Sequence, residues 1–233
     1  MKWARDLLND FLCMLFPRIC YGCSNHLIGN EYLICTECYV IIPRTNFHTI
    51  KDNTLEQVFY GRCKIESAAA FSYFNKGSRI RNLIHSLKYK GIKEIGSELG
   101  KIYGRSLKSS DFLGGIDFIA PVPLHKSKKR TRGFNQSETI AAGISEVTGL
   151  PLITNAIERR LVTSTQTKHS KTERWDNVEG VFSLKNPHLL AGKHILLVDD
   201  VITTGATMES CVNEILKAEG AKVSIAALAY APS

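Results

Sequence analysis

The stretch HILLVDDVITTGATMES, residues 194–210, decides the fold. Four apolar residues at 195–198 run into Asp199 and Asp200, and a small, hydroxyl-rich turn follows. A continuous apolar run of this kind predicts a buried strand, and the turn is expected to lead into a helix. In an open α/β sheet, ligands bind at the carboxyl ends of the strands. The stretch therefore predicts a ligand site in the loop after this strand.

The turn has the composition of a phosphate-binding loop. The first N–H groups of a helix have no partner within the helix, and the helix dipole attracts anions to them. Threonine hydroxyls add donors, and a glycine lets the backbone approach its ligand closely. The pattern G-x-x-x-x-G-K-[ST] is absent from the sequence, which disfavours a nucleoside triphosphatase. The predicted phosphate-binding residues are Thr203, Thr204, Gly205, Ala206 and Thr207.

The two acids need a different target. Asp199 and Asp200 would repel a phosphate held in the same loop. A sugar attached to that phosphate presents neighbouring hydroxyls, which carboxylates accept well, and Mg²⁺ would be drawn to the same place. The alternative interpretation is a helix cap and a surface acid at the end of a strand. The combination of two acids, a buried strand and the TTGAT turn favours the sugar site.

Charge supports an anionic ligand. The chain of 233 residues has a formal charge of +8, and basic proteins bind nucleic acid, nucleotides, pyrophosphate or membrane surfaces. Residues 121–174 alone carry ten basic residues against four acidic ones. The apolar content is 44%, but no apolar run is long enough to span a bilayer. One or two soluble domains are therefore expected.

Strands and helices are predicted to alternate after residue 64. Strand patterns cover residues 65–74, 116–123, 193–200 and 222–230, and helical patterns cover 78–89, 92–107, 137–148 and 208–218. This order predicts a mostly parallel sheet with helices on its faces. A polar stretch at 163–179 has no periodicity and is predicted to be a mobile loop.

Four cysteines form two C-x2-C pairs separated by eleven residues. Paired knuckles of this kind place four thiolates around one ion, and Zn²⁺ suits a closed sulfur shell. Two disulfides or an iron–sulfur centre are the alternatives. The predicted ligands are Cys20, Cys23, Cys35 and Cys38.

The first residues of the chain are predicted to form an amphipathic helix at 3–16, stopped by Pro17. Asp6 and Asp10 interrupt its apolar stretch and no cleavage site follows, so a signal peptide is not expected. This favours a cytoplasmic protein. The helix is expected to pack on the chain, with a membrane-surface or partner-docking role left open.

Several segments together resemble a known family. VDDVITTGAT resembles the 5-phosphoribosyl-1-pyrophosphate (PRPP) motif of type I phosphoribosyltransferases. LKYKG at 87–91, PVPLHKSKKRTRGFNQ at 121–136, the block at 159–182 and the four-cysteine segment resemble the competence protein F (ComF, GntX-like) family. The resemblance covers about residues 17–230. It implies a type I phosphoribosyltransferase-like α/β fold, with a zinc-ribbon-like module at 1–60 and the transferase-like domain at 61–233.

The resemblance also implies roles for the residues. The loop at 203–207 would hold the 5-phosphate of PRPP, and Asp199 and Asp200 would bind the ribose hydroxyls and serve catalysis. The stretch at 163–179 would close over the site as a flap. The candidates for binding the pyrophosphate are Lys126, Arg132, Lys168 and Arg174. Mg²⁺ would accompany PRPP.

Two functions follow from these patterns. The first is an Mg²⁺-dependent phosphoribosyltransferase that uses PRPP and an unidentified acceptor, with a role in DNA uptake and natural competence. The second is a non-catalytic protein that senses PRPP or handles single-stranded DNA alongside DNA-uptake proteins. Aromatic residues are not interleaved with the basic ones as a single-strand platform needs, which disfavours the second. The cysteine module is expected to cap the other domain or to mediate a homodimer.

Overall fold

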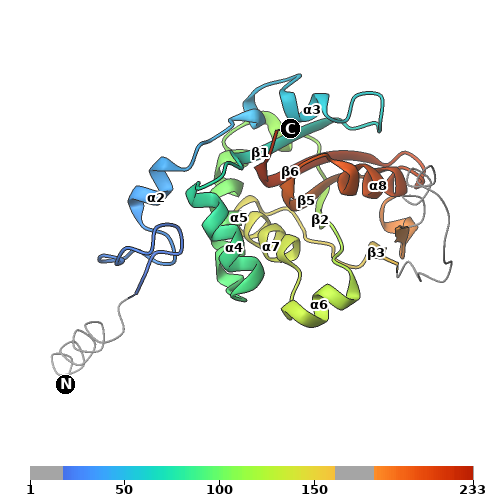
Figure 1. The fold of residues 1–233 in the computed structure, drawn as a ribbon. Helices are drawn as coiled ribbons and strands as arrows, with labels where there is room; N and C mark the ends of the chain where they lie inside the picture. Colours follow the sequence, from blue (N-terminus) through green and yellow to red (C-terminus); the bar gives the residue numbers. More distant parts are fainter. Residues whose placement is uncertain (1–17, 161–180, 233) are drawn as a thin grey trace, which may run out of the picture.

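A parallel four-stranded sheet organises the protein. The computed structural model describes residues 18–160 and 181–232 (Figure 1). The strand order is β1-β6-β5-β2, and every neighbouring pair is parallel. The strands are β1 (Ser67–Tyr73), β2 (Phe118–Pro121), β5 (His194–Ile202) and β6 (Lys222–Tyr230). The predicted α/β fold with a mostly parallel sheet is confirmed.

Both faces of the sheet are covered. Along β5, Leu196 and Val198 belong to one apolar cluster and Ile195 and Leu197 to the other. This alternation follows from the two-residue period of a strand, and burial on both sides explains why the run is continuously apolar. The first cluster is built with α4 (Arg79–Tyr89), α5 (Lys93–Lys108) and α7 (Gln136–Thr148). The second is built with α8 (Ala206–Ile215), α3 (Thr54–Gln57), and the antiparallel pair β3 (Ile157–Arg159) and β4 (Phe182–Leu184).

Shorter elements complete the described chain. Helix α6 (Lys126–Arg132) follows β2, and α2 (Thr36–Ile41) lies in the cysteine segment, away from the sheet (Figure 1). Three 3-10 turns cover Phe47–Thr49, Asp111–Leu113 and Pro187–Leu189. In the described residues, no helix is long and apolar enough to cross a membrane. The helix predicted at 3–16 and the whole loop predicted at 163–179 lie outside the described residues.

Residues just before the predicted boundary at 60 pack on the sheet. The Phe47 ring lies 5.8 Å from the Tyr73 ring, centroid to centroid, at the end of β1. The Asn53 side-chain amide donates to the Ala68 carbonyl at 2.9 Å. The division of the chain into 1–60 and 61–233 stays a prediction.

Helices α5 and α7 approach each other unusually closely because glycines line the contact. On α5 the glycines recur every fourth residue, at Gly96, Gly100 and Gly104. A Cβ atom on Gly100 would lie 2.2 Å from the Ile140 carbonyl oxygen, and one on Gly143 would lie 2.1 Å from the Ser97 carbonyl oxygen. These approaches leave no room for a side chain. They fix the position of α7, whose first residues reach the end of β5.

We predict that Gly100→Ala lowers the free energy of unfolding by roughly 1–3 kcal/mol, because the methyl group forces the two backbones apart. Alanine otherwise favours a helix over glycine, so a loss isolates the packing effect. Arg105→Ala on the exposed side of α5 is the control, with an expected change within about 0.5 kcal/mol. Urea unfolding measures both. A Gly100→Ala protein as stable as wild type would contradict the close packing.

Candidate functional site

The loop after β5 has the predicted course into a helix. Gly205 caps α8 with a positive φ of 76°, and the loop residues on either side are exposed. A hollow is lined by the loop, by Asp199 and by the first residues of α8. The N–H groups at the start of α8 therefore face a space that an anion can enter.

A distant segment supports this loop from behind. A Cβ atom on Gly205 would lie 2.9 Å from Val58 and 3.1 Å from Phe59, so the loop closes on the segment after α3. The Arg62 guanidinium donates to the Thr204 carbonyl at 2.7 Å and pairs with Glu209 on α8. Sequence reasoning missed Arg62, because a contact across 142 residues leaves no local pattern.

Each of the two acids at the end of β5 has a partner. Asp199 Oδ1 accepts from the Ser137 hydroxyl at 2.7 Å and from the Asp200 backbone N–H at 2.8 Å. Asp200 pairs with Lys88 at the end of α4, with Lys88 Nζ 2.9 Å from Asp200 Oδ2. Burial, followed by the charge of Asp200, raises the pKa of Asp199 to about 7. Asp199 is therefore partly protonated near neutral pH.

A cleft of about 200 Å³ brings the acids together with basic residues. Asp199 and Asp200 line it together with part of the RGFNQ segment at 132–136. Its basic lining residues are Lys88, Lys128, Arg132 and Arg159. Lys126, the first residue of α6, is exposed and does not line this cleft. Lys168 and Arg174 lie outside the described residues.

The RGFNQ segment shapes this cleft through its backbone. Gly133 has a φ of 81° and ends α6. The Asn135 side chain donates to the Val122 carbonyl at 3.0 Å and accepts from the Ser137 N–H at 3.2 Å, so it caps α7 and ties it to the end of β2. Arg132 Nη1 donates to Gln136 Oε1 at 2.8 Å. The segment thus places Ser137 beside Asp199.

A wider basic pocket of about 500 Å³ shares Lys88, Lys128 and Arg132 with the cleft. Lys90 and the exposed Tyr89 also line it, and the Arg132 guanidinium lies 5.6 Å from the centre of the Tyr89 ring. No carboxylate is among the described residues that line this pocket. The cleft and the basic pocket together form a basic surface that can hold a polyanion.

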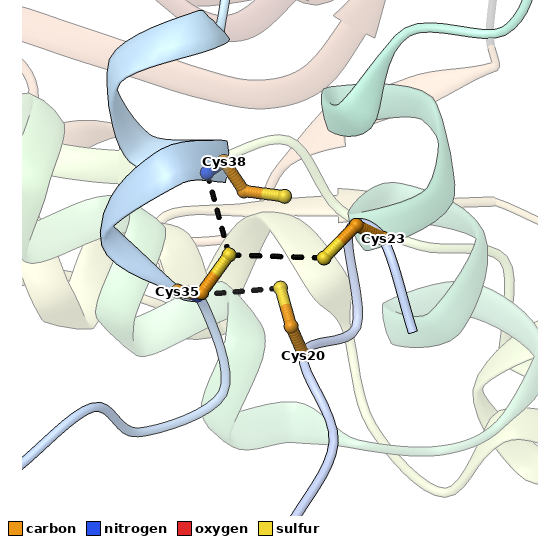
Figure 2. A group of neighbouring side chains, drawn as sticks. All are labelled: Cys20, Cys23, Cys35 and Cys38. Carbon is orange, nitrogen blue, oxygen red and sulfur yellow. Dashed lines mark hydrogen bonds between the residues drawn. The ribbon is translucent and has the colours of Figure 1, made fainter. Parts of the chain in front are cut away.

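The four predicted cysteines also meet at one point (Figure 2). Their Sγ atoms all lie within 4.8 Å of one another, with Cys23 and Cys35 3.7 Å apart. Four sulfurs about 2.3 Å from a central Zn²⁺ would be separated by about 3.8 Å in a tetrahedron. Burial opposes ionisation of Cys20, but backbone N–H donors led by that of Cys35 hold its pKa at about 7. The cluster fits a metal ion, and the free thiols exclude disulfides between these cysteines in this structure.

Comparison with known proteins gives consistent matches. Residues 125–233 match the phosphoribosyl transferase domain family. The DNA utilization protein YhgH of Escherichia coli strain K12 is 32% identical over 146 residues, covering 61% of this chain and 63% of the relative. Competence protein ComFC of Bacillus subtilis strain 168 is 26% identical over 243 residues, covering 96% and 89%. Competence protein F of Haemophilus influenzae is 34% identical over 114 residues, covering 48% of each chain.

The chain is similar to members of the competence protein F family. The match with the E. coli relative spans only about 63% of that relative's length, whereas the match with the Bacillus subtilis relative spans most of both chains. The predicted resemblance to this family and the predicted phosphoribosyltransferase-like fold are therefore confirmed.

Helix α4 connects the cysteine cluster to the cleft. The Asn82 side-chain amide donates to the Gly22 carbonyl between the first two cysteines, at 2.8 Å. Leu83 and Leu87 share an apolar cluster with Cys20 and Cys38. Lys88, near the end of the same helix, reaches Asp200. The cysteine segment is therefore packed against the helix that supplies a residue to the cleft.

We predict that Asp199 makes stability depend on pH. Its folded pKa of about 7 lies above the unfolded value, so its favourable contribution is complete below about pH 4 and is lost as pH rises through 7. Relative to Asp199→Asn, wild type should lose up to about 1.4 kcal/mol per pH unit between pH 5 and 8. Urea unfolding at four pH values measures this difference.

Asp117→Asn is the control for this series. The His194 N–H and then Lys193 lower the pKa of Asp117, so its contribution is already complete at pH 5 and should stay constant to pH 8. A constant difference between wild type and Asp199→Asn across the same range would contradict the raised pKa.

Proposed function

We propose that the protein binds PRPP with Mg²⁺ in the cleft and transfers its phosphoribosyl group to an acceptor that is not yet identified. The observation that carries this proposal is the meeting of three features: the two acids at the end of β5, the exposed N-terminus of α8 and the basic residues of the same cleft. PRPP has a ribose, a 5-phosphate and a 1-pyrophosphate, and each feature suits one of these parts. The phosphoribosyl transferase domain match supports the proposal.

The residues would act by holding the substrate. Backbone N–H groups and hydroxyls of residues 203–207 bind the 5-phosphate, while Asp199 and Asp200 accept hydrogen bonds from the ribose hydroxyls. As the bond from the anomeric carbon to pyrophosphate breaks, positive charge develops on the sugar, and these carboxyl groups stabilise it. Arg132 and Lys128 meet the leaving pyrophosphate. No covalent nucleophile is required.

Mg²⁺ fits the donor set. The carboxylate oxygens of Asp199 and Asp200, which line the cleft, are ligands of the kind that this ion prefers. When bound with PRPP, the ion supplies charge neutralisation on the pyrophosphate. The roles of Lys126, Lys168 and Arg174 in binding pyrophosphate stay predictions.

Isothermal titration of wild type with PRPP and Mg²⁺ tests the binding step. We expect saturable binding that Asp200→Asn weakens at least about tenfold, because hydrogen bonds to a charged acceptor contribute about 1.5–3 kcal/mol. Asp117→Asn, at the opposite end of the sheet, should bind as wild type does. Absence of binding by wild type, or equal binding by wild type and Asp200→Asn, would reject the proposal.

The cysteine cluster is proposed to hold one structural Zn²⁺. A closed shell of four thiolates leaves no open position for catalysis. Purified protein should contain about one zinc per chain by plasma mass spectrometry, and Cys38→Ser should lose the metal and melt at a lower temperature. Cys63→Ser, outside the cluster, should retain both properties. Visible absorbance from an iron–sulfur cluster in the anaerobically purified protein would contradict the zinc assignment.

DNA handling is the second candidate function. The basic pocket with its exposed Tyr89 favours it, because such a surface can meet a phosphate backbone and a base. The names of the E. coli and Bacillus subtilis relatives, DNA utilization protein and competence protein, agree with it. Fluorescence anisotropy of a labelled single-stranded oligonucleotide, titrated with PRPP, distinguishes a DNA site in the cleft from a DNA site elsewhere on the protein. Displacement by PRPP would place DNA in the cleft, whereas binding that PRPP does not affect would place it elsewhere.

A further inference from the structure

Lys88 lies between the cleft and the basic pocket, which are called the two hollows below. It lines both the 200 Å³ cleft and the basic pocket, and its ammonium group is held by Asp200. The Lys88 side chain is 22% exposed and that of Asp200 is 12% exposed, so water screens this pair less than a surface ion pair. The pair therefore occupies an oxygen of the carboxylate that is proposed to bind ribose.

The position of Lys88 is set by the packing of α4. Leu83, Ile84 and Leu87 are buried against the sheet, which fixes the rotation of the helix about its axis. The chain then turns away at Gly91, whose φ is 73°. Leu87 and Gly91 are the first and last residues of the LKYKG segment at 87–91. The segment thus holds an ammonium group at the mouth of the cleft on a rigid helix.

The two arginines of the cleft already have contacts of their own. Arg132 donates to Gln136 and lies over the Tyr89 ring, and the Arg159 guanidinium lies 5.4 Å from the centre of the Phe182 ring. Among these contacts, only that of Lys88 is to a carboxylate of β5. A ligand that engages Asp200 must therefore compete with Lys88.

The same cleft contains a polar donor without a partner. Gln136 is 1% exposed, and its Oε1 atom accepts from Arg132. Its Nε2 atom is buried and has no hydrogen-bond partner among the described residues. An unpaired buried donor is unfavourable and is expected to be satisfied by a ligand or water. The cleft therefore offers donors to a ligand that is rich in acceptor oxygens.

We infer that Lys88 exchanges partners when PRPP binds: its ammonium group separates from Asp200 and pairs with the pyrophosphate. This exchange makes the site selective for ribose that carries a 1-pyrophosphate. This inference rests on the proposed function. The pyrophosphate is attached to the carbon next to the one that carries the 2-hydroxyl, so a cation beside Asp200 is near both groups. A flexible four-carbon stem lets the ammonium group move this short distance.

The selectivity follows from electrostatics. Without ligand, Lys88 neutralises a largely buried carboxylate, and separating the pair is unfavourable. PRPP offsets that loss because its pyrophosphate provides a new anionic partner. Ribose 5-phosphate also separates Lys88 from Asp200, but it has no pyrophosphate with which the ammonium group can pair. Lys88 is therefore expected to strengthen binding of PRPP and to weaken binding of ribose 5-phosphate.

Titration of the full-length protein with both ligands in Mg²⁺ at pH 8 tests this. Lys88→Met should bind PRPP at least about tenfold more weakly than wild type, and ribose 5-phosphate equally well or more tightly. Lys88→Arg should keep its affinity for PRPP within about threefold of wild type, since it retains the charge. Lys93→Met, exposed at the start of α5 and outside both hollows, is the control and should match wild type for both ligands.

The outcomes separate this inference from the proposed function. Equal losses for both ligands in Lys88→Met would show that Lys88 is only structural, and unchanged PRPP binding would show that it does not meet pyrophosphate; either result overturns the exchange. Thermal melting checks that the variants are folded, and if Lys88→Met is not, Lys88→Gln provides the same comparison. If wild type itself does not bind PRPP, the proposed function fails and the exchange fails with it.

Discussion

Two adjacent carboxyl groups at the end of a buried strand are the constraint on which the site depends. Asp199 and Asp200 can share this position only because each has its own partner, Ser137 for the first and Lys88 for the second. Ser137 is brought there by the Asn135 cap and by the close contact of α7 with α5. The glycines between these helices therefore serve the site, because a wider separation would move the start of α7 away from β5.

The second partner connects the cleft to the cysteine cluster. Helix α4 contacts the cysteine segment through the hydrogen bond from Asn82, and it places Lys88 beside Asp200. These two residues lie on one continuous helix, so a shift of its N-terminal half is carried to its end. Packing between the cysteines and the leucines of α4 is thus a physical route by which a bound metal ion would stabilise the geometry of the cleft.

The parts of the site that are local in sequence could be predicted, and the parts that depend on distant contacts could not. The apolar run at 195–198, the two acids and the TTGAT turn predict a buried strand and a ligand-binding loop that leads into a helix. Charge located the basic segment, but it could not show that Lys128, and not Lys126, lines the cleft. Helical spacing could have helped, because Lys128 and Arg132 are four residues apart and share a face. The recurrence of glycine at 96, 100 and 104 was another available signal. Lys88 and Arg62 act across long separations that leave no pattern.

The arrangement also explains how acids and an anion-binding loop coexist. With its pKa raised to about 7, Asp199 is partly protonated near neutral pH, so it repels an approaching phosphate less than an ordinary aspartate does. The charge of Asp200 is balanced by Lys88. The remaining charge of the cleft then comes from Lys128, Arg132 and Arg159, which attract a polyanion. The acids thus stay available as hydrogen-bonding groups for a sugar while the electrostatic character of the cleft remains basic.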